Sequence, residues 1–584
     1  MATKKTKTKQ RLKKTLPRNQ ESAPPVPRLE PAMQEPIERV TTRAIAAGLV
    51  LSLVLCAMNS YLTLSFGVIE EGPTIAALFF FAIFLISRTK ITTTEMVIVA
   101  TMGSAGGSLG FISNFYAAKT LNGTPYSILD MTLFGIVSSL IGLVMVIPLR
   151  QLLVLREKLP WPGARATESV IRTLVERGDP RQAVILVVTF ALMTIYVVGN
   201  SDGGFAWWPD AVALGGLASV GGYIALSPFA IGGAYLMGMR TCVGFLFGAA
   251  ALMIGKRWMP IPADASPHTF YWPGLSFLVA SGLTTMAINW RVIAGAFRSM
   301  FALGGKTDDD DPIMTGRTLA AFATVSFALC AIVLNTRFAI NLFLVVVLVV
   351  VAGLIQNIIA TRAAAQTAFN PARVMGILLQ GVTAALGGRT ADINLTGAGF
   401  VAGSGAQAGV LTGDMAYGRW LKVPSRWQFW FQTVTVVPCA VISAYMFDWI
   451  RQTKDIAAHM PAPIAKMWAA SALLFDEGFS SLPQGAGKAL ILGAVVGVVY
   501  TLIELVPVLR KWLPESIGLG LGLVLTPALG ISFFVGGFLF WIVLGRWCKV
   551  DEATLTTMAV ACIVAEGIGG VMKPLLTMAG LIAG

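Results

Sequence analysis

Long apolar runs recur from residue 43 to the end of the chain, and they constrain its fold more than any other feature. A full membrane crossing by a helix needs about 20 mainly apolar residues. Charged residues make up only 13% of the chain, whereas a soluble globular protein carries roughly 25%. The sequence therefore predicts an all-α polytopic integral membrane protein.

The expected number of transmembrane helices is about 14–17, because several runs are short or interrupted by glycine. Residues 59–81 and 515–540 each consist of an apolar half, a glycine or proline break, and a second apolar half. This pattern predicts some broken or re-entrant helices and two pseudo-repeated halves. The predicted crossings lie near residues 43–66, 68–87, 95–116, 127–149, 181–199, 211–227, 229–255, 274–290, 318–334, 338–360, 374–388, 395–413, 428–447, 488–506, 516–529, 530–546 and 553–582.

Residues 1–40 have a different composition from the remainder of the chain. The first nineteen residues contain eight Lys or Arg and no acid, and residues 17–36 contain six prolines. Such a segment cannot bury enough apolar surface to fold. We therefore expect a disordered, basic and Pro-rich cytoplasmic tail, followed by a transmembrane domain over residues 41–584.

The charges of the loops predict their sides of the membrane. Residues 150–181 hold seven Lys or Arg, whereas residues 200–210 hold none. Because positive loops stay inside, we expect 150–181 to be cytoplasmic in a multi-pass protein of the inner (plasma) membrane. Residues 448–487 would then be external, with an amphipathic segment near 462–475 that lies on the membrane surface or caps the protein. The acidic run 308–311 is expected to be a solvated loop.

Carboxylates within or beside the apolar segments are candidates for ion coupling. An ionisable group at membrane depth costs several kcal/mol, and so it is a functional candidate by default. Glu70 and Glu71 lie directly before a Gly-Pro break and could bind a proton, a cation or a substrate amine. The complete set of ion-coupling candidates is Glu70, Glu71, Glu95, Asp414 and Glu566.

Four uncharged residues are candidates for substrate binding. Residues 394–414 contain six glycines together with Ser404 and Gln407. So many glycines disfavour a regular helix, and the segment is predicted to be a broken helix that lines the substrate path. The alternative is that these glycines only permit close helix packing. Asn59 and Tyr61 are expected to face the same cavity.

Several other kinds of function are disfavoured by the residues. The net charge of +14 is divided between the tail and the loops, so we expect no nucleic-acid partner. The six cysteines lie in or beside apolar segments without a CxxC pair, which predicts small buried hydrophobes. We expect no metal site and no cofactor. No GxxxxGK[ST] phosphate-binding loop is present, so energy must come from an ion gradient or a partner subunit.

Six stretches of the chain carry distinctive motifs, in this order: MNSYLTLSFG (58–67), TTTEMVIVATMGSAGG (92–107), IPLRQLLVLREKLPWPGARATESVI (147–171), SPFAIGGAYLMGMRTCVGFLFGA (227–249), VAGSGAQAGVLTGDMAYGRWLKVPSRWQF (401–429) and IVAEGIGGVM (563–572). These motifs and their order resemble those of the oligopeptide transporter (OPT) family, in particular its prokaryotic branch. The resemblance implies a secondary transporter that is coupled to protons and carries small peptides or metal–chelate complexes. Met96, Ala416 and residues 64–66 depart from the family pattern, and the loss of the family's early lysine at 64–66 leaves the identity of the substrate open.

The leading hypothesis is proton-coupled uptake of oligopeptides or peptide-like compounds, with an importer of metal–chelate complexes as the alternative. The expected partners are the substrate, protons and membrane lipid, and a homo-oligomer is left open. A membrane hydrolase with Ser404 as nucleophile lacks a histidine in a membrane segment to act as base. A passive channel fits less well, because charges at broken helices suit binding better than conduction.

Overall fold

The computed structural model describes residues 39–66, 72–86, 90–177, 180–202, 204–258, 271–288, 309–350, 356–367, 372–388, 390–478 and 486–582. Within these ranges, nine helices are long and apolar enough to cross a membrane. Three shorter apolar helices accompany them. The predicted all-α polytopic membrane protein is therefore confirmed, whereas the total of about 14–17 crossings stays a prediction.

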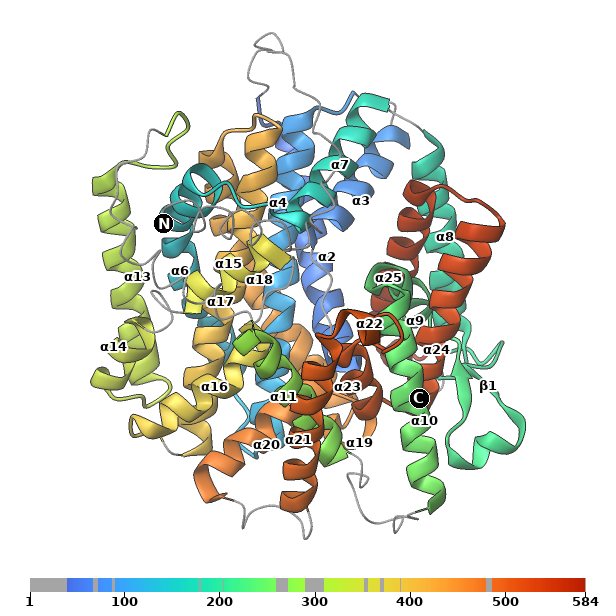
Figure 1. Ribbon diagram of the computed structural model, residues 1–584. Helices are drawn as coiled ribbons and strands as arrows, with labels where there is room; N and C mark the ends of the chain where they lie inside the picture. Colours follow the sequence, from blue (N-terminus) through green and yellow to red (C-terminus); the bar gives the residue numbers. More distant parts are fainter. Residues whose placement is uncertain are drawn as a thin grey trace, which may run out of the picture. The chain divides into compact units, whose positions relative to one another are not determined.

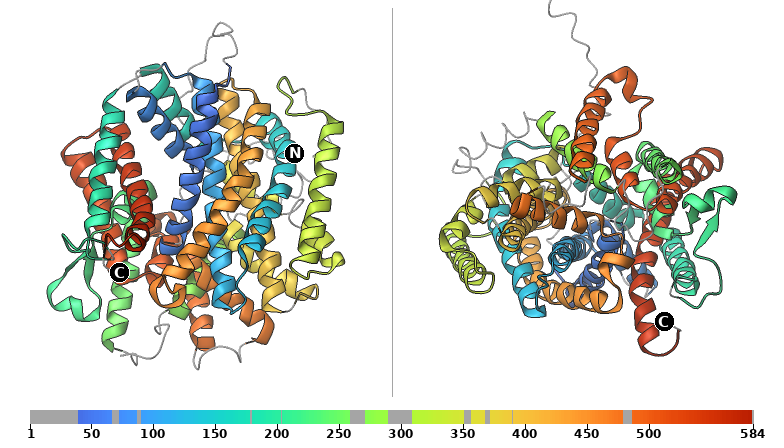
Figure 2. Two further views of the ribbon diagram at one scale, coloured as in Figure 1. Left: turned by 180° about the vertical axis from the view of Figure 1, so that it is seen from behind. Right: turned by 90° about the horizontal axis from the view of Figure 1, so that it is seen from below.

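Five helices make up the N-terminal part of the membrane domain: α2 (Thr42–Phe66), α3 (Gly72–Ile86), α4 (Thr93–Phe111), α5 (Ser113–Leu121) and α6 (Ile128–Leu149). The apolar window of α4 is wholly buried. A Cβ atom on Gly106 would lie 2.1 Å from the Ser52 carbonyl oxygen of α2. Such small residues let two membrane helices approach closely. In both views of Figure 2, α2 and α4 (blue) lie beside the orange α18 (Ser425–Thr453).

The predicted cytoplasmic loop 150–181 is mostly helical. A π-helical turn, η1 (Arg150–Arg156), continues α6 beyond Pro148, and α7 (Pro162–Arg177) follows it. Next comes α8 (Pro180–Gly199), which packs against α25 (Glu552–Met578) near the opposite end of the sequence (Figure 1).

The predicted crossing at 211–227 is wrong. This segment is a small antiparallel hairpin of β1 (Ala211–Ala213) and β2 (Tyr223–Ala225), joined by the 3-10 helix η2 (Gly215–Val220). Gly215 and Gly221 have positive φ angles of 54° and 91°, which glycine adopts without a steric penalty. These turns end the regular backbone, so an apolar composition does not produce a helix here.

The predicted crossing at 229–255 and the predicted broken segment 515–540 each contain two shorter helices. The crossing at 229–255 breaks at Gly238, whose φ is +86°, into α9 (Pro228–Met237) and α10 (Met239–Trp258). The predicted break in 515–540 is present, because α23 (Ser516–Val524) ends before Pro527, where α24 (Pro527–Gly537) begins. A π-helical segment, η5 (Phe538–Trp547), continues α24.

The remaining helices complete the described part of the chain. Of them, α20 buries Trp468 completely and packs on α5, α16 and α17. Their bounds are α11 (Tyr271–Ile288), α13 (Gly316–Thr336), α14 (Leu342–Val350), α15 (Asn357–Thr367), α16 (Ala372–Ala385), α17 (Ala391–Trp420), α19 (Ile456–His459), α20 (Pro463–Glu477), α21 (Ala486–Glu504) and α22 (Pro507–Arg510).

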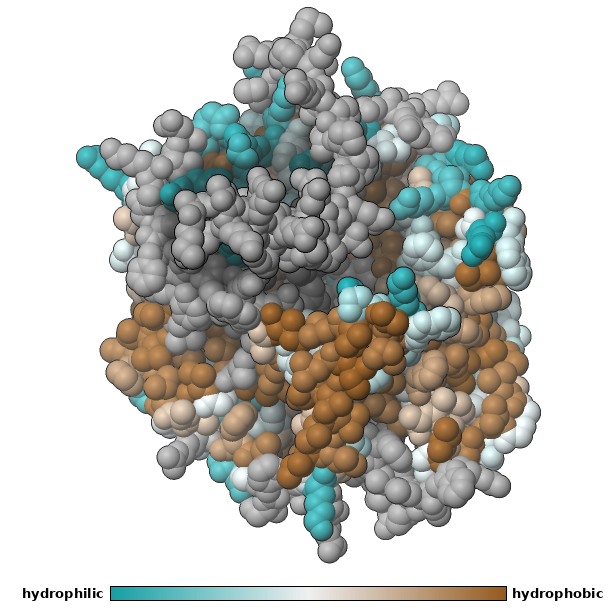
Figure 3. Space-filling view, viewed as in Figure 1, coloured by the Kyte–Doolittle hydropathy of each residue, from teal (hydrophilic) through white to brown (hydrophobic). Residues whose placement is uncertain are grey.

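The exposed surface of several helices is apolar, as expected for contact with lipid. Figure 3 shows a hydrophobic area over α21, where Ile491, Leu492, Val495 and Val499 are all exposed.

Five of the six cysteines are buried, but Cys548 is exposed, which corrects the prediction that all six are buried. Cys548 directly follows η5.

In the described part of the acidic run, Asp310 is exposed as expected for a solvated loop, whereas the Asp309 side chain is only 8% exposed. Asp309 accepts a 2.6 Å hydrogen bond from Arg150, whose side chain is only 1% exposed. Asp310 accepts from Arg419 at 2.8 Å, and Asp311 accepts from the backbone N–H of Ser425 at 2.7 Å. We call Asp309–Asp311 the acidic clasp, because its three carboxylates join η1 to the adjoining ends of α17 and α18.

Candidate functional site

The glycine-rich segment 394–414 is not a broken helix. It lies within α17, a continuous 30-residue α-helix whose N-cap is Thr390. The prediction of a break is wrong because tertiary packing outweighs the low helix propensity of glycine. A Cβ on Gly399 would lie 2.5 Å from the Phe115 ring, and one on Gly403 would lie 3.1 Å from Ser138. These glycines allow close packing, which was the alternative interpretation.

Ser404 and Gln407 lie together in the buried core, as their spacing on one helix predicts. The Ser404 hydroxyl donates to Asn357 Oδ1 at 3.1 Å and accepts from Asn357 Nδ2 at 3.0 Å. Gln407 Oε1 accepts from Ser108 at 2.7 Å, but Gln407 Nε2 has no hydrogen-bond partner among the described residues.

Two other buried side-chain amides, those of Gln356 and Gln432, resemble that of Gln407. Both side-chain polar atoms of Gln356 and of Gln432 are without a hydrogen-bond partner in the described part of the chain. Gln356 is fully buried beside Gly405 of α17, and Gln432 is fully buried on α18. Buried amides are normally satisfied, so these side chains offer donors and acceptors to a polar ligand or to water. Neither residue is among the candidates that the sequence indicates.

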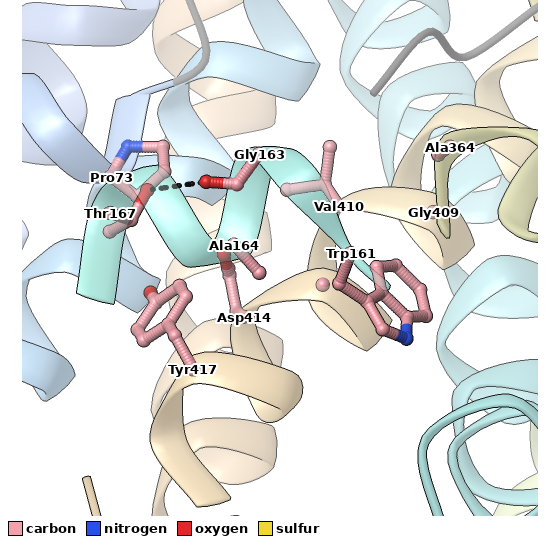
Figure 4. Close-up of a pocket in the computed structure, with 11 residues that line it drawn as sticks. Pro73, Trp161, Gly163, Ala164, Thr167, Ala364, Gly409, Val410, Asp414 and Tyr417 are labelled. Carbon is pink, nitrogen blue, oxygen red and sulfur yellow. Dashed lines mark hydrogen bonds between the residues drawn. The ribbon is translucent and has the colours of Figure 1, made fainter. Parts of the chain in front are cut away.

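A cleft opens between α7 and the C-terminal part of α17, and Asp414 lies in its wall (Figure 4). The space inside the cleft that a water-sized group can occupy is about 50 Å³. The Asp414 carboxyl is buried and interacts with the Tyr417 hydroxyl, which lies 3.2 Å from the Thr101 hydroxyl. Other lining residues are Pro73, Trp161, Gly163, Ala164, Thr167, Ala364, Gly409, Val410 and Gly413.

Trp161 forms one wall of this cleft and was overlooked as a functional residue. Its φ of +47° lies in the left-handed region, which is strained for a tryptophan. The backbone N–H donates to Ala365 at 2.8 Å, and the indole is 3% exposed against Gly413. The signal in the sequence was the PWPG stretch, which lies within one of the OPT-like motifs.

Tyr61 and Glu566 are brought together at a second position, between α2 and α25. A Cβ on Gly570 of α25 would lie 2.2 Å from the Tyr61 ring, and Glu566 acts electrostatically on Tyr61. The Glu566 carboxyl also lies by the backbone N–H of Phe229 at the N-terminus of α9. Glu566 Oε2 has no hydrogen-bond partner among the described residues.

Lys573 provides the basic group of this second site. It is 7% exposed on α25, seven residues after Glu566, and it acts electrostatically on that carboxyl. Its Nζ atom donates to Asn200 Oδ1 at 2.8 Å and to the Asp202 carbonyl at 2.6 Å. Lys573 therefore connects the Glu566 site to the segment that follows α8.

Asn59 and Tyr61, which were expected to face one cavity, contact different helices. Asn59 is fully buried against α4, where a Cβ on Gly110 would lie 2.5 Å from the Asn59 Cβ. Tyr61 instead contacts α25. Residues two apart on an α-helix point in nearly opposite directions, so the helical geometry explains this separation.

Glu95 is held in contacts at the start of α4. Its carboxylate accepts from Arg43 Nε at 2.8 Å and from a second guanidinium nitrogen at 2.9 Å. It also accepts from the Thr41 hydroxyl and forms a capping box with Thr92. These contacts fix the first turn of α4 to the first turn of α2. The other two carboxylate candidates, Glu70 and Glu71, lie outside the described residues.

Comparison with known proteins identifies the family of the chain. The family model described as OPT oligopeptide transporter protein matches residues 39–576. A Saccharomyces cerevisiae protein, "Putative oligopeptide transporter YGL114W", is 20% identical over 92% of this chain and 96% of its own length. This relative is a yeast protein, so it does not support the narrower assignment to the prokaryotic branch. The chain is therefore a multi-pass membrane protein that belongs to the OPT oligopeptide transporter family, a family of transporters and not of enzymes.

Proposed function

We propose that this protein is a secondary active transporter that couples the uptake of oligopeptides or peptide-like compounds to proton entry. The observation that carries the proposal is Glu566, a carboxyl buried in a membrane helix with one oxygen that lacks a partner among the described residues. A carboxyl at membrane depth is costly, and it typically marks an ion or proton site.

The surroundings of Glu566 fit an ion-coupling group. Its carboxyl lies by the N-terminus of α9 and on the same helix as Lys573, whose charge acts on it. Half-helix N-termini pointing into a buried site are typical of transporters with discontinuous helices. A proton on Glu566 would change the charge next to Tyr61, between α2 and α25.

The substrate would bind along α17 through uncharged groups. Ser404, Gln407 and the neighbouring Gln356 supply hydroxyl and amide groups of the kind that pair with a peptide main chain. Asn59 is not included, because it packs against α4. Of the ion-coupling candidates, the described geometry supports Glu566 most directly, while the contacts of Glu95 fit an anchoring role better.

The placement in the membrane is part of the same proposal. The basic side chains Arg150, Arg165 and Arg419 lie at the end of α17 that carries the cleft. By the positive-inside rule this end would be cytoplasmic in the inner (plasma) membrane, with the N-terminus on the same side. The substrate would then enter from the opposite end.

Proteoliposomes that contain the full-length protein test this function. Labelled trialanine should accumulate when the lumen is alkaline relative to the medium, and counterflow should show a carrier and not a channel. Glu566→Gln should lose the accumulation driven by the pH gradient but keep counterflow, because exchange needs no net proton movement. The proposal is wrong if Glu566→Gln accumulates trialanine as the unmodified protein does. Uptake of a ferric–nicotianamine complex in place of trialanine would favour the metal–chelate alternative.

A further inference from the structure

We propose that an apolar groove between α11, α16, α20 and α21 binds a membrane phospholipid, with one acyl chain inside the groove and the phosphate beside Lys488. The inference goes beyond the proposed transport function, because it assigns a site that takes no part in substrate binding or coupling. The space in the groove that water-sized groups can occupy is about 320 Å³. An apolar cavity of about 150 Å³ already stays dry and binds a molecule as large as benzene, so this groove can hold a longer hydrocarbon chain.

The lining of the groove selects hydrocarbon over water or peptide. Every described lining residue is uncharged, and the two hydroxyl groups among them are already engaged. Ser276 donates to the Pro273 carbonyl at 3.2 Å, and Ser471 donates to the Trp468 carbonyl at 3.1 Å. A buried water needs about two to four polar partners, and a peptide group without a partner is costly to bury. An acyl chain has no hydrogen-bonding group and meets neither cost.

The two sides of the groove are formed by helices that pack separately. On one side, a Cβ on Gly493 of α21 would lie 2.2 Å from the Pro273 carbonyl oxygen of α11, so these two helices are in close contact. On the other side, α20 packs on α16 and α17. An empty gap between the two sides would forfeit the van der Waals contacts of its lining. A chain that fills the groove would therefore stabilise the contact between them.

Lipid is the medium that surrounds the groove. One wall is α21, which is long and apolar enough to cross a membrane. Ile491 is 59% exposed and belongs to the hydrophobic area over α21 in Figure 3, and it also lines the groove. The groove is therefore continuous with the surface that faces lipid, and an acyl chain can enter it from the side.

Lys488 supplies a charge that complements a phospholipid headgroup. It is exposed in the first turn of α21, three residues before Ile491, and residues at this spacing are neighbours on a helix. Lysine near the membrane surface attracts anionic headgroups. An acidic side chain, Asp476, follows the lining residue Leu474 by two positions, but it accepts a 2.7 Å hydrogen bond from the Ala391 N–H of α17. The headgroup is therefore assigned to the Lys488 end of the groove.

Two lipids that differ only in the headgroup test the position of the phosphate. Phosphatidylglycerol and a diacylglycerol with the same acyl chains are titrated into the purified full-length protein in detergent, and the rise in melting temperature gives their affinities. Phosphatidylglycerol should bind about fivefold more tightly, because one lysine attracts an anionic headgroup by this order. Lys488→Gln should weaken phosphatidylglycerol to the level of the diacylglycerol and leave the diacylglycerol unchanged. Lys511→Gln, an exposed lysine beyond the other end of α21, is the matched control and should change neither affinity.

Variants that fill the groove test the position of the acyl chain. Ala470→Phe on α20 and Ala494→Phe on α21 should each abolish the stabilisation by both lipids, because the added ring occupies the groove. Val495→Phe is the matched control, since Val495 is 55% exposed outside the groove lining, and it should keep the stabilisation. Phosphatidylglycerol with a photoreactive acyl chain should label the groove residues of α20 and α21 in the unmodified protein. This labelling needs no variant, so it remains decisive if a phenylalanine variant does not fold.

Three outcomes would overturn the inference. Equal affinities for phosphatidylglycerol and the diacylglycerol would show that no phosphate is bound beside Lys488. Unchanged lipid stabilisation in both folded phenylalanine variants would show that the groove is only a packing gap. Displacement of the photoreactive lipid by trialanine would show that the groove belongs to the substrate path. Transport of trialanine is measured separately, so failure of the lipid site leaves the proposed function untouched.

Discussion

The Ser108 hydroxyl of α4 donates a 2.7 Å hydrogen bond to Gln407 Oε1 of α17. This bond joins two buried helices through residues that are 299 positions apart in the sequence. The amide nitrogen of the same Gln407 has no partner among the described residues. One side of this amide therefore stabilises the helix pair, while the other side remains for a ligand or for water.

Gln407→Leu and Ser404→Ala should have different consequences. Gln407→Leu removes one hydrogen bond together with an amide nitrogen that lacks a partner, so the melting temperature should change little while trialanine affinity falls. Ser404→Ala leaves the buried Asn357 amide without its partner, which costs about 1–3 kcal/mol. Uptake affinity and melting of both variants check this. Unchanged affinity in Gln407→Leu would remove Gln407 from the substrate site.

Gly142→Ala should destabilise the contact between α6 and α17. Its Cβ would lie 2.4 Å from the Ser404 carbonyl oxygen, and neither backbone can move easily. Overpacking of this kind costs about 1–3 kcal/mol. The matched control is Gly316→Ala, where nothing lies within 4 Å of the added atom. A thermal melt in detergent should show a lower midpoint for the first variant only, and equal midpoints would contradict the close approach.

Some of the helix boundaries could be predicted from the sequence. The Thr-Pro pair at 526–527 marked the break between α23 and α24, because proline cannot donate within a helix and starts a new one readily. The continuity of α17 could not be predicted, because it depends on Phe115 and Ser138 filling the space beside Gly399 and Gly403. Helix propensities contain no information about such distant neighbours.

The residues of the candidate site could also be predicted only in part. Glu566 and Asp414 were found because a carboxylate in an apolar run is conspicuous in any sequence. Trp161 and Gln356 were overlooked, because neither carries a charge and their importance depends on neighbours that are distant in sequence. The pairing of Arg150 with Asp309 joins residues 159 apart, and a single sequence gives no means to connect them.

The acidic clasp should respond unequally to loss of its carboxylates. Asp309→Asn leaves the buried Arg150 charge without its nearest partner, a change that costs about 3–5 kcal/mol. Asp310 is 77% exposed in its pair with Arg419, so Asp310→Asn should cost about 0–1 kcal/mol. Melting temperatures of the two variants check the difference. Equal losses would show that the burial of Arg150 does not determine the strength of the clasp.

The pH dependence of the clasp follows from the same pair. Hydrogen bonding to Arg419 holds the pKa of the Asp310 carboxyl below its usual range. A lowered carboxyl pKa contributes stability above the usual pKa, and this contribution is lost as the pH falls through the lowered value. The difference in melting temperature between the unmodified protein and Asp310→Asn should therefore shrink on acidification. A difference that grows on acidification would contradict this assignment.

The last prediction concerns Glu95, whose contacts suggest an anchor and not a coupling group. Arg43 and Thr41 of the α2 end both donate to this fully buried carboxylate, and Thr92 completes the capping box. Glu95→Gln keeps the shape of the side chain but removes its negative charge. The Arg43 guanidinium then loses its ion-pair partner, which is destabilising. We therefore expect a clearly lower melting temperature, with the ratio of gradient-driven to counterflow uptake unchanged in the protein that remains folded. Glu566→Gln is the matched comparison, because it should change that ratio while the melting temperature stays close to that of the unmodified protein. If Glu95→Gln alters the ratio without affecting melting, Glu95 takes part in coupling after all, and the contacts with Arg43 would then be the feature that moves during transport.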